Sequence, residues 1–103
     1  MEEALKRIIN HYGIMKQLKY IHSEYYELDE AIINAENNRN VGITRGICAS
    51  CIKHIAEELA DVMVMLEQFR LNYGISEDYI AQIAQYKVER QLKRIEEENE
   101  KEQ

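Results

Sequence analysis

The absence of proline constrains this chain more than any other feature of its sequence, since the 103 residues also include only four glycines. Proline interrupts a helix because it lacks an N–H donor and its ring clashes with the preceding turn. Helices can therefore continue without interruption between the glycines, which favour helix ends and turns. The glycines are Gly13, Gly42, Gly46 and Gly74. We expect an all-α protein whose helices end near these positions.

Apolar residues recur every three or four positions along two long segments, as they do on the packed side of a helix. The first segment covers residues 14–37, where the stripe consists of Ile14, Leu18, Ile21, Tyr25, Leu28, Ile32 and Ala35. The second covers residues 47–73, where it consists of Ile52, Ile55, Leu59, Val62, Leu66, Phe69 and Tyr73. We expect two antiparallel helices packed along these stripes. Turn-forming residues over 37–44 predict the loop between them.

Two further helices are expected at the ends of the chain. Residues 2–12 form a short amphipathic segment that Gly13 closes, and a fourth helix begins after Ser76, which is suited to an N-cap. A hydrophobic content of 46% suffices for a packed core, and the length fits one domain. We expect one bundle-like, four-helix domain over 1–95, followed by an acidic, frayed tail over 96–103.

The formal net charge of −6 argues against nucleic acid or an anionic membrane as the main partner, because both select basic surfaces. No segment reaches the roughly 18–20 apolar residues that a membrane-spanning helix needs. The sequence begins Met1-Glu2-Glu3 rather than with the basic and apolar stretch of a secretory signal. We therefore expect a cytoplasmic protein.

Cys48 and Cys51 form a Cys-x-x-Cys pair, which is compatible with a redox pair or with half of a zinc site. His54 does not complete a zinc site on the same helix, because it lies roughly 120° around the axis and about 9 Å along it from Cys48. The simplest interpretation is a pair of small thiols that are buried or half-buried.

Four acids stand out when the two long helices are drawn as wheels at about 100° per residue. Glu24 is flanked by apolar residues on both sides, and Glu27 shares the edge of the apolar arc with Ile21. Glu58 has the same setting on the other long helix, with Asp61 about 60° away at the rim. The two helices thus repeat one arrangement of carboxylates.

A carboxylate inside a core costs several kcal/mol or becomes neutralised, so a pair on each of two facing helices requires a reason. A shared Mg²⁺ supplies one, because this ion prefers oxygen ligands and bridges carboxylates to phosphates. The alternative is that two of the acids reach the rim and pair with Lys or Arg. A di-iron bundle is excluded, since no histidine follows a carboxylate by three residues. His54, one turn before Glu58, either orients a ligand or lies at the rim.

The segments Glu24-Tyr25-Tyr26-Glu27 and Glu58-Leu59-Ala60-Asp61 together resemble the Glu-x-x-Glu and Glu-x-x-Asp signature of the all-α nucleoside triphosphate pyrophosphohydrolases. MazG, the dimeric dUTPases and phosphoribosyl-ATP pyrophosphohydrolase belong to that group. The likeness covers roughly residues 5–95 and is greatest to short, stand-alone MazG-like proteins. The interval between the motifs is on the long side for the family and carries the cysteine pair.

This resemblance implies a MazG-type fold and a role in house-cleaning of the nucleotide pool. Glu24, Glu27, Glu58 and Asp61 would hold Mg²⁺, with Mn²⁺ as a possible substitute, and water would split a nucleoside triphosphate into the monophosphate and pyrophosphate. The alternative from a different class is a non-catalytic helical protein that binds a partner or regulates nucleotides.

The resemblance also implies where the substrate and a second subunit would bind. Lys87 and Arg90 would neutralise phosphates, unless they belong to a solvated helix face. The family builds its base pocket partly from N-terminal helices, where Asn10, Tyr12 and Gln17 are candidates, although Tyr12 also suits a core position. Family members assemble sites between subunits, so a homodimer or homotetramer is expected.

Overall fold

The computed structural model describes residues 1–39 and 46–102, and these residues form α-helices without any strand. The helices are α1 (Glu2–Tyr12), α2 (Ile14–Asn37), α3 (Ala49–Asn72) and α4 (Glu77–Glu102). The predicted all-α class is therefore confirmed, and the bounds of the first three helices agree with those expected from the sequence to within about two residues. Most of the predicted loop, including Gly42, lies outside the described residues.

The chain divides into two compact units, Met1–Tyr73 and Gly74–Gln103. The first contains α1, α2 and α3, and the second contains α4. The single domain expected over 1–95, the fourth helix's place in a bundle and the MazG-type fold stay predictions.

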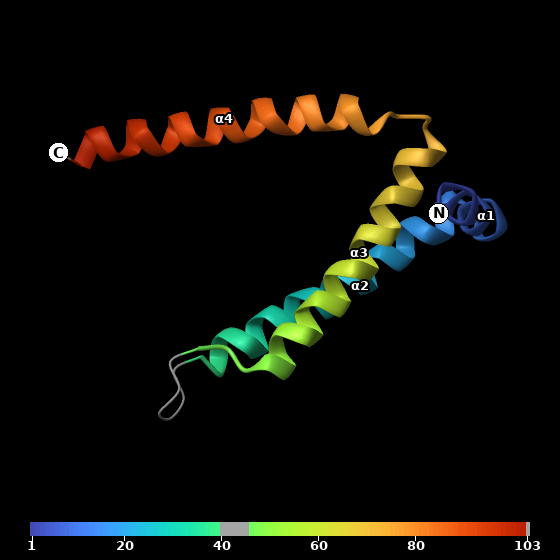
Figure 1. Ribbon diagram of the computed structural model, residues 1–103, viewed down its shortest axis with the longest axis horizontal. Helices are drawn as coiled ribbons and strands as arrows, with labels where there is room; N and C mark the ends of the chain where they lie inside the picture. Colours follow the sequence, from blue (N-terminus) through green and yellow to red (C-terminus); the bar gives the residue numbers. More distant parts are fainter. Residues whose placement is uncertain (40–45, 103) are drawn as a thin grey trace. The chain divides into compact units, whose positions relative to one another are not determined.

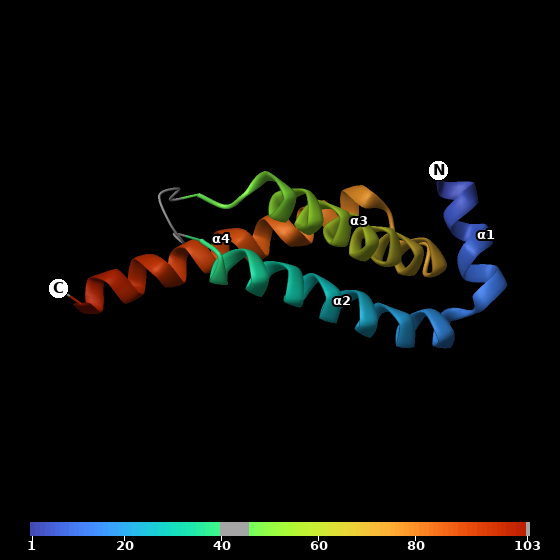
Figure 2. The ribbon, with the colours of Figure 1, turned by 90° about the horizontal axis from the view of Figure 1, so that it is seen from below.

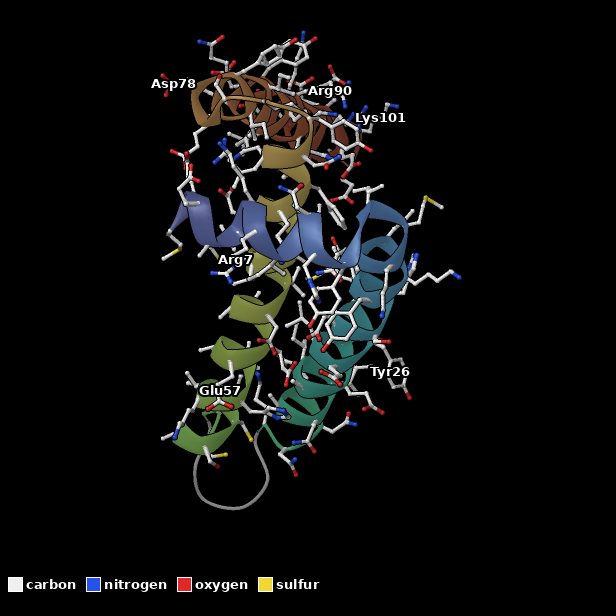
Figure 3. All side chains as sticks on the ribbon, turned by 90° about the vertical axis from the view of Figure 1, so that its right-hand side faces the viewer. Arg7, Tyr26, Glu57, Asp78, Arg90 and Lys101 are labelled. Carbon is white, nitrogen blue, oxygen red and sulfur yellow. The ribbon has the colours of Figure 1, made fainter. Side chains whose placement is uncertain are left out.

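Within the first unit, α2 and α3 run antiparallel and pack along most of their length (Figures 1 and 2). α1 packs mainly on α3 and lies across the end of the pair where α2 begins and α3 ends (Figure 3). The chain turns from α1 into α2 at Gly13, whose φ of 89° lies in the region that residues with a Cβ rarely adopt. A glycine is thus required to bring α1 back across the pair.

The packed sides of α2 and α3 differ from those that the apolar stripes predict. On α2, Leu18, Tyr25 and Ile32 are exposed, and the buried residues are Gln17, Ile21, Glu24, Ala31 and Ala35. This buried set also follows three-four spacing, but its centre is rotated about 60° around the helix from the apolar stripe. On α3 the same rotation leaves Ile52, Leu59 and Leu66 exposed and buries Val62 and Met65. The interface therefore centres on the side that carries the acids.

The rotation is supported by polar contacts across the interface. The Gln17 side chain donates a hydrogen bond of 2.9 Å to Oε1 of Gln68. The residue Gln68 is only 1% exposed. Arg70 is buried as well, and its guanidinium binds Glu67 at 2.9 Å and Glu2 of α1 at 3.5 Å. These contacts hold α2 to α3 and α1 to α3, respectively.

Helix α4 begins as the sequence predicts, because the Ser76 hydroxyl accepts a 3.1 Å hydrogen bond from the backbone N–H of Tyr79. Glu77 and Asp78 occupy its first turn. The helix continues to Glu102, through most of the segment expected to form a frayed tail, and all of its described residues are exposed. Across the described chain, every helix is too short or too polar to traverse a lipid bilayer.

Candidate metal centre

Each of the two long helices supplies two of the four acids, and the two acids on one helix are about one turn apart. Glu24 and Glu27 share one side of α2, and Glu58 and Asp61 share one side of α3, since residues three apart are neighbours on a helix surface. The antiparallel packing brings both pairs to the same level of the interface. One carboxylate oxygen from each residue lies within 4.8 Å of those of the other three. The convergence expected from the sequence is thus present.

Residues next to the converging acids in the sequence lie on the outer sides of the helices. Tyr26 of the first motif points away from the pair, and Glu57, directly before Glu58, also lies on the outside (Figure 3). Both side chains are exposed. Acids are common in this sequence, and the position of each acid on its helix therefore determines whether it joins the cluster.

Burial separates the four acids into an inner and an outer pair. Glu24 is 6% exposed, and the side chain of Glu58 is 13% exposed, whereas Glu27 and Asp61 are exposed at the rim. Among the described residues, Oε2 of Glu24 and Oε2 of Glu58 are buried and have no hydrogen-bond partner. Buried polar atoms are normally satisfied, so two such oxygens at one place indicate a missing partner.

The charges of the cluster repel one another and shift the titration of its inner members. Burial raises the pKa of Glu24, with further upward contributions from Asp61, Glu27 and Glu58, while a hydrogen bond from Tyr20 acts in the opposite direction. Burial likewise raises the pKa of Glu58, and the nearby charges of Glu27 and Asp61 add to it. In both inner carboxylates, burial and the neighbouring acids outweigh the effects that lower the pKa.

His54 is the neighbour that partly offsets this repulsion. Its Nε2 lies 3.4 Å from Oε1 of Glu58, one turn along α3, and the imidazole itself is about half exposed. The charge of His54 lowers the pKa of Glu58, but less than burial and Glu27 raise it. The histidine thus stands at the rim and also orients one oxygen of Glu58, which leaves the other oxygen free. Ion pairing with Lys or Arg, the alternative explanation for the acids, is not observed for these four carboxylates in the described part of the chain.

The donor set fits a hard divalent cation. All four residues offer carboxylate oxygens, which Mg²⁺, Mn²⁺ and Ca²⁺ prefer, and no thiolate stands among them. An ion bound there would satisfy the two orphaned oxygens and neutralise the repulsion.

A pocket of about 460 Å³ opens beside the acids at the α1 end of the pair. Glu24 and Asp61 contribute to its wall, so it adjoins the candidate metal centre directly. Tyr12 and Tyr20 supply aromatic surface, and the ammonium of Lys16 lies 5.4 Å from the centre of the Tyr12 ring. The volume falls in the range of about 300–1,000 Å³ typical of small-molecule sites.

Only some of the candidate substrate-binding residues line this pocket. Tyr12 and Gln17 line the pocket, although the amide of Gln17 is engaged with Gln68. Asn10 is exposed on α1 and is not among the residues that line it. Lys87 and Arg90 are exposed on α4, in the other unit, so their contact with phosphates stays a prediction.

Sequence analysis missed several residues of this pocket. Lys16 and Tyr20 were not selected, although Tyr20 stands one turn before Glu24 and hydrogen-bonds to it. Gln68 was missed because a buried amide leaves no apolar signal in the pattern. It shares the side of α3 that carries Glu58 and Asp61, so the sequence does not distinguish it from a solvated polar residue.

Comparison with known proteins gives no match: neither a family model, nor a curated protein, nor a solved structure is significantly similar to this chain.

Proposed function

We propose that this protein is a Mg²⁺-dependent nucleoside triphosphate pyrophosphohydrolase of the MazG-like type, which acts on the nucleotide pool. The observation that carries the proposal is the convergence of Glu24, Glu27, Glu58 and Asp61, with two buried oxygens lacking partners, beside a pocket of nucleoside size. The resemblance of the two acidic motifs to those of the pyrophosphohydrolases adds the reaction class.

The acids would hold the ion, with Mn²⁺ as a possible substitute for Mg²⁺. A bound Mg²⁺ supplies positive charge for the triphosphate and lowers the pKa of water. The inner pair, Glu24 and Glu58, would fix the ion in a partly desolvated setting, where electrostatic interactions are stronger than in bulk water. The outer pair, Glu27 and Asp61, is exposed, so the polyphosphate could reach the ion from solvent on that side.

The pocket would hold the nucleoside. Tyr12 and Tyr20 offer rings against which a base can pack, and Gln17 and Gln68 present amide groups beside them. Lys16 lies in the wall of the same pocket and would contribute positive charge. Hydrolysis of the bond between the α- and β-phosphates then consumes one water and releases the nucleoside monophosphate and pyrophosphate.

The proposed enzyme is a homodimer or homotetramer. The rotation of the α2–α3 interface leaves large apolar side chains exposed along both helices, among them Leu18, Tyr25, Leu59 and Leu66. On antiparallel helices a rotation of the same sense brings the exposed stripes to one side of the pair. A second copy of the chain would cover this surface, because contiguous apolar patches mark association sites.

A substrate panel tests the proposed reaction. The protein is incubated with each common ribo- and deoxyribonucleoside triphosphate and Mg²⁺, and pyrophosphate release is followed. We expect turnover of at least one nucleotide, abolished by a chelator and restored by excess Mg²⁺. Folded protein that binds a nucleotide but releases no pyrophosphate from any member of the panel would establish the non-catalytic alternative instead.

A further inference from the structure

The first turn of α3 brings two thiols together. Cys48 is the N-cap residue of the helix, and Cys51 follows one turn later. Their sulfur atoms lie 2.8 Å apart, and both cysteines are free. Cys48 is exposed and Cys51 is half-buried, so reagents in solution reach the first sulfur more easily than the second.

The surroundings of Cys48 stabilise negative charge on its sulfur. The sulfur accepts a hydrogen bond of 3.4 Å from the backbone N–H of Cys51 and lies 3.3 Å from the hydroxyl of Ser50. It stands at the positive end of the helix dipole, and the first turn of α3 contains no acidic residue. Hydrogen bonds from Cys51 and Ser50 lower the pKa of Cys48 to about 7, and the contact with Cys48 raises the pKa of Cys51.

We propose that Cys48 and Cys51 form a reversible thiol–disulfide exchange site for low-molecular-weight disulfides, in which Cys48 is the attacking thiol and Cys51 the resolving thiol. This inference rests on the contact between the sulfurs at the helix start and is independent of the proposed hydrolase activity.

The reaction balances in two steps. The Cys48 thiolate attacks one sulfur of the small disulfide, forms a mixed disulfide and releases one small thiolate. Cys51 then gives up its proton to solvent and attacks the Cys48 sulfur, which forms the internal disulfide and releases the second thiolate. The two cysteines lose two electrons, and the small disulfide gains them.

The geometry favours the second step. A disulfide bond is about 2.05 Å long, so the sulfurs need to approach by less than about 1 Å from their present contact. Rotation about the side-chain bonds of an exposed and a half-buried residue suffices for this. The internal disulfide should therefore form faster than a second small disulfide can react at Cys51.

The test uses the reduced full-length protein and oxidised glutathione at neutral pH, followed by intact mass and by mapping of the modified cysteine. Wild type should lose two hydrogen atoms and accumulate little adduct. The Cys51→Ser variant should stop at a glutathione adduct on Cys48. The Cys48→Ser variant, in which only the Cys51 thiol remains, should react about three- to fivefold more slowly than Cys51→Ser. A smaller fraction of Cys51 is thiolate at neutral pH, and this outweighs the higher nucleophilicity of the more basic thiolate.

Equal rates for Cys48→Ser and Cys51→Ser would overturn the assignment of the attacking thiol. A wild-type protein that carries adducts on both cysteines, or that forms disulfides between chains, would overturn the internal pairing. As a control, the two single variants are compared in urea, where unfolding removes the helix and should abolish their difference in rate.

Discussion

Glu57 and Glu58 are adjacent in the sequence, yet α3 directs them to opposite environments. Glu58 faces the other acids and has a buried oxygen without a partner in the described chain, whereas Glu57 is exposed on the outside. The two residues therefore provide a matched pair of variants that differ in position but not in chemistry.

We expect Glu58→Gln to abolish pyrophosphate release, because it removes a charged ligand from the centre of the proposed ion site. The helical fold should remain intact or become more stable, since the variant removes a partly desolvated charge. Circular dichroism and urea unfolding report the fold, and the substrate panel reports activity. Glu57→Gln should behave as wild type; loss of activity in both variants would point to a general effect of charge.

The two inner acids also make the stability of the metal-free protein depend on pH. The pKa of Glu24 and of Glu58 is raised in the folded state above the ordinary value of 4.5, so folding favours their protonated forms. Their contribution is fully present below pH 4.5 and is lost as the pH rises through the folded-state pKa values. Wild type should thus lose stability from pH 5 to pH 7.5 relative to the Glu24→Gln/Glu58→Gln variant.

Urea unfolding of both proteins at the two pH values, in chelator, measures this difference. Comparison with the double variant is necessary because Glu67 contributes in the opposite direction, its pKa being lowered by the hydrogen bond from Arg70. A difference that does not change with pH would show that the inner acids are solvated in the free protein. Addition of Mg²⁺ at pH 7.5 should stabilise wild type more than the double variant.

Among the elements, α2 and α3 are joined by the buried glutamines as well as by apolar contacts. Gln17 donates to Gln68, and the Gln68 amide donates to the backbone oxygen of Val64 at 3.3 Å. Gln68→Leu leaves the amide of Gln17 without its oxygen partner in the interface. We expect it to lower the free energy of unfolding by about 1–3 kcal/mol.

A double-mutant cycle tests this interpretation. Gln17→Leu/Gln68→Leu removes both amides and should be less destabilised than the sum of the single variants, because neither partner remains unsatisfied. Gln85→Leu, on the exposed surface of α4, serves as the control and should change stability by less than about 0.5 kcal/mol. Additive effects in the cycle would mean that the two glutamines act separately.

The helices themselves were predictable, because proline is absent and the glycines and Ser76 punctuate the pattern. The rotation of α2 and α3 was not, since the apolar stripe at Leu18, Tyr25 and Ile32 is stronger in the sequence than the mixed side that is buried. The acids were found because Glu24 and Glu58 interrupt apolar surroundings at corresponding places. Pocket residues such as Lys16 and Gln68 depend on tertiary packing, which no local pattern specifies.

The rotation of α2 and α3 also affects how copies of the chain can assemble. Leu59 is 44% exposed and Leu66 is 45% exposed, on a surface that a second chain would cover in the proposed oligomer. We expect Leu59→Glu/Leu66→Glu to shift a dimer or tetramer to monomer, because it places charge in an apolar interface. Sedimentation velocity gives the mass of both proteins.

The control is Lys53→Glu, which adds negative charge on α3 at an exposed polar residue. It should retain the mass of wild type. Monomeric wild type at micromolar concentration would contradict the proposed oligomer, and a variant that keeps the wild-type mass would exclude this surface as the interface.

The buried oxygens of Glu24 and Glu58 also bear on the lifetime of the polypeptide in a cell. Proteases cleave the transiently opened form of a protein, and its population depends on the free energy of opening. An interface that contains two unsatisfied carboxylates opens more readily when no cation fills it. With Mg²⁺ bound as proposed, at a free concentration 100 times its dissociation constant, opening becomes harder by about 2.7 kcal/mol. Magnesium starvation would then lower the abundance of the protein through degradation, in addition to removing its cofactor.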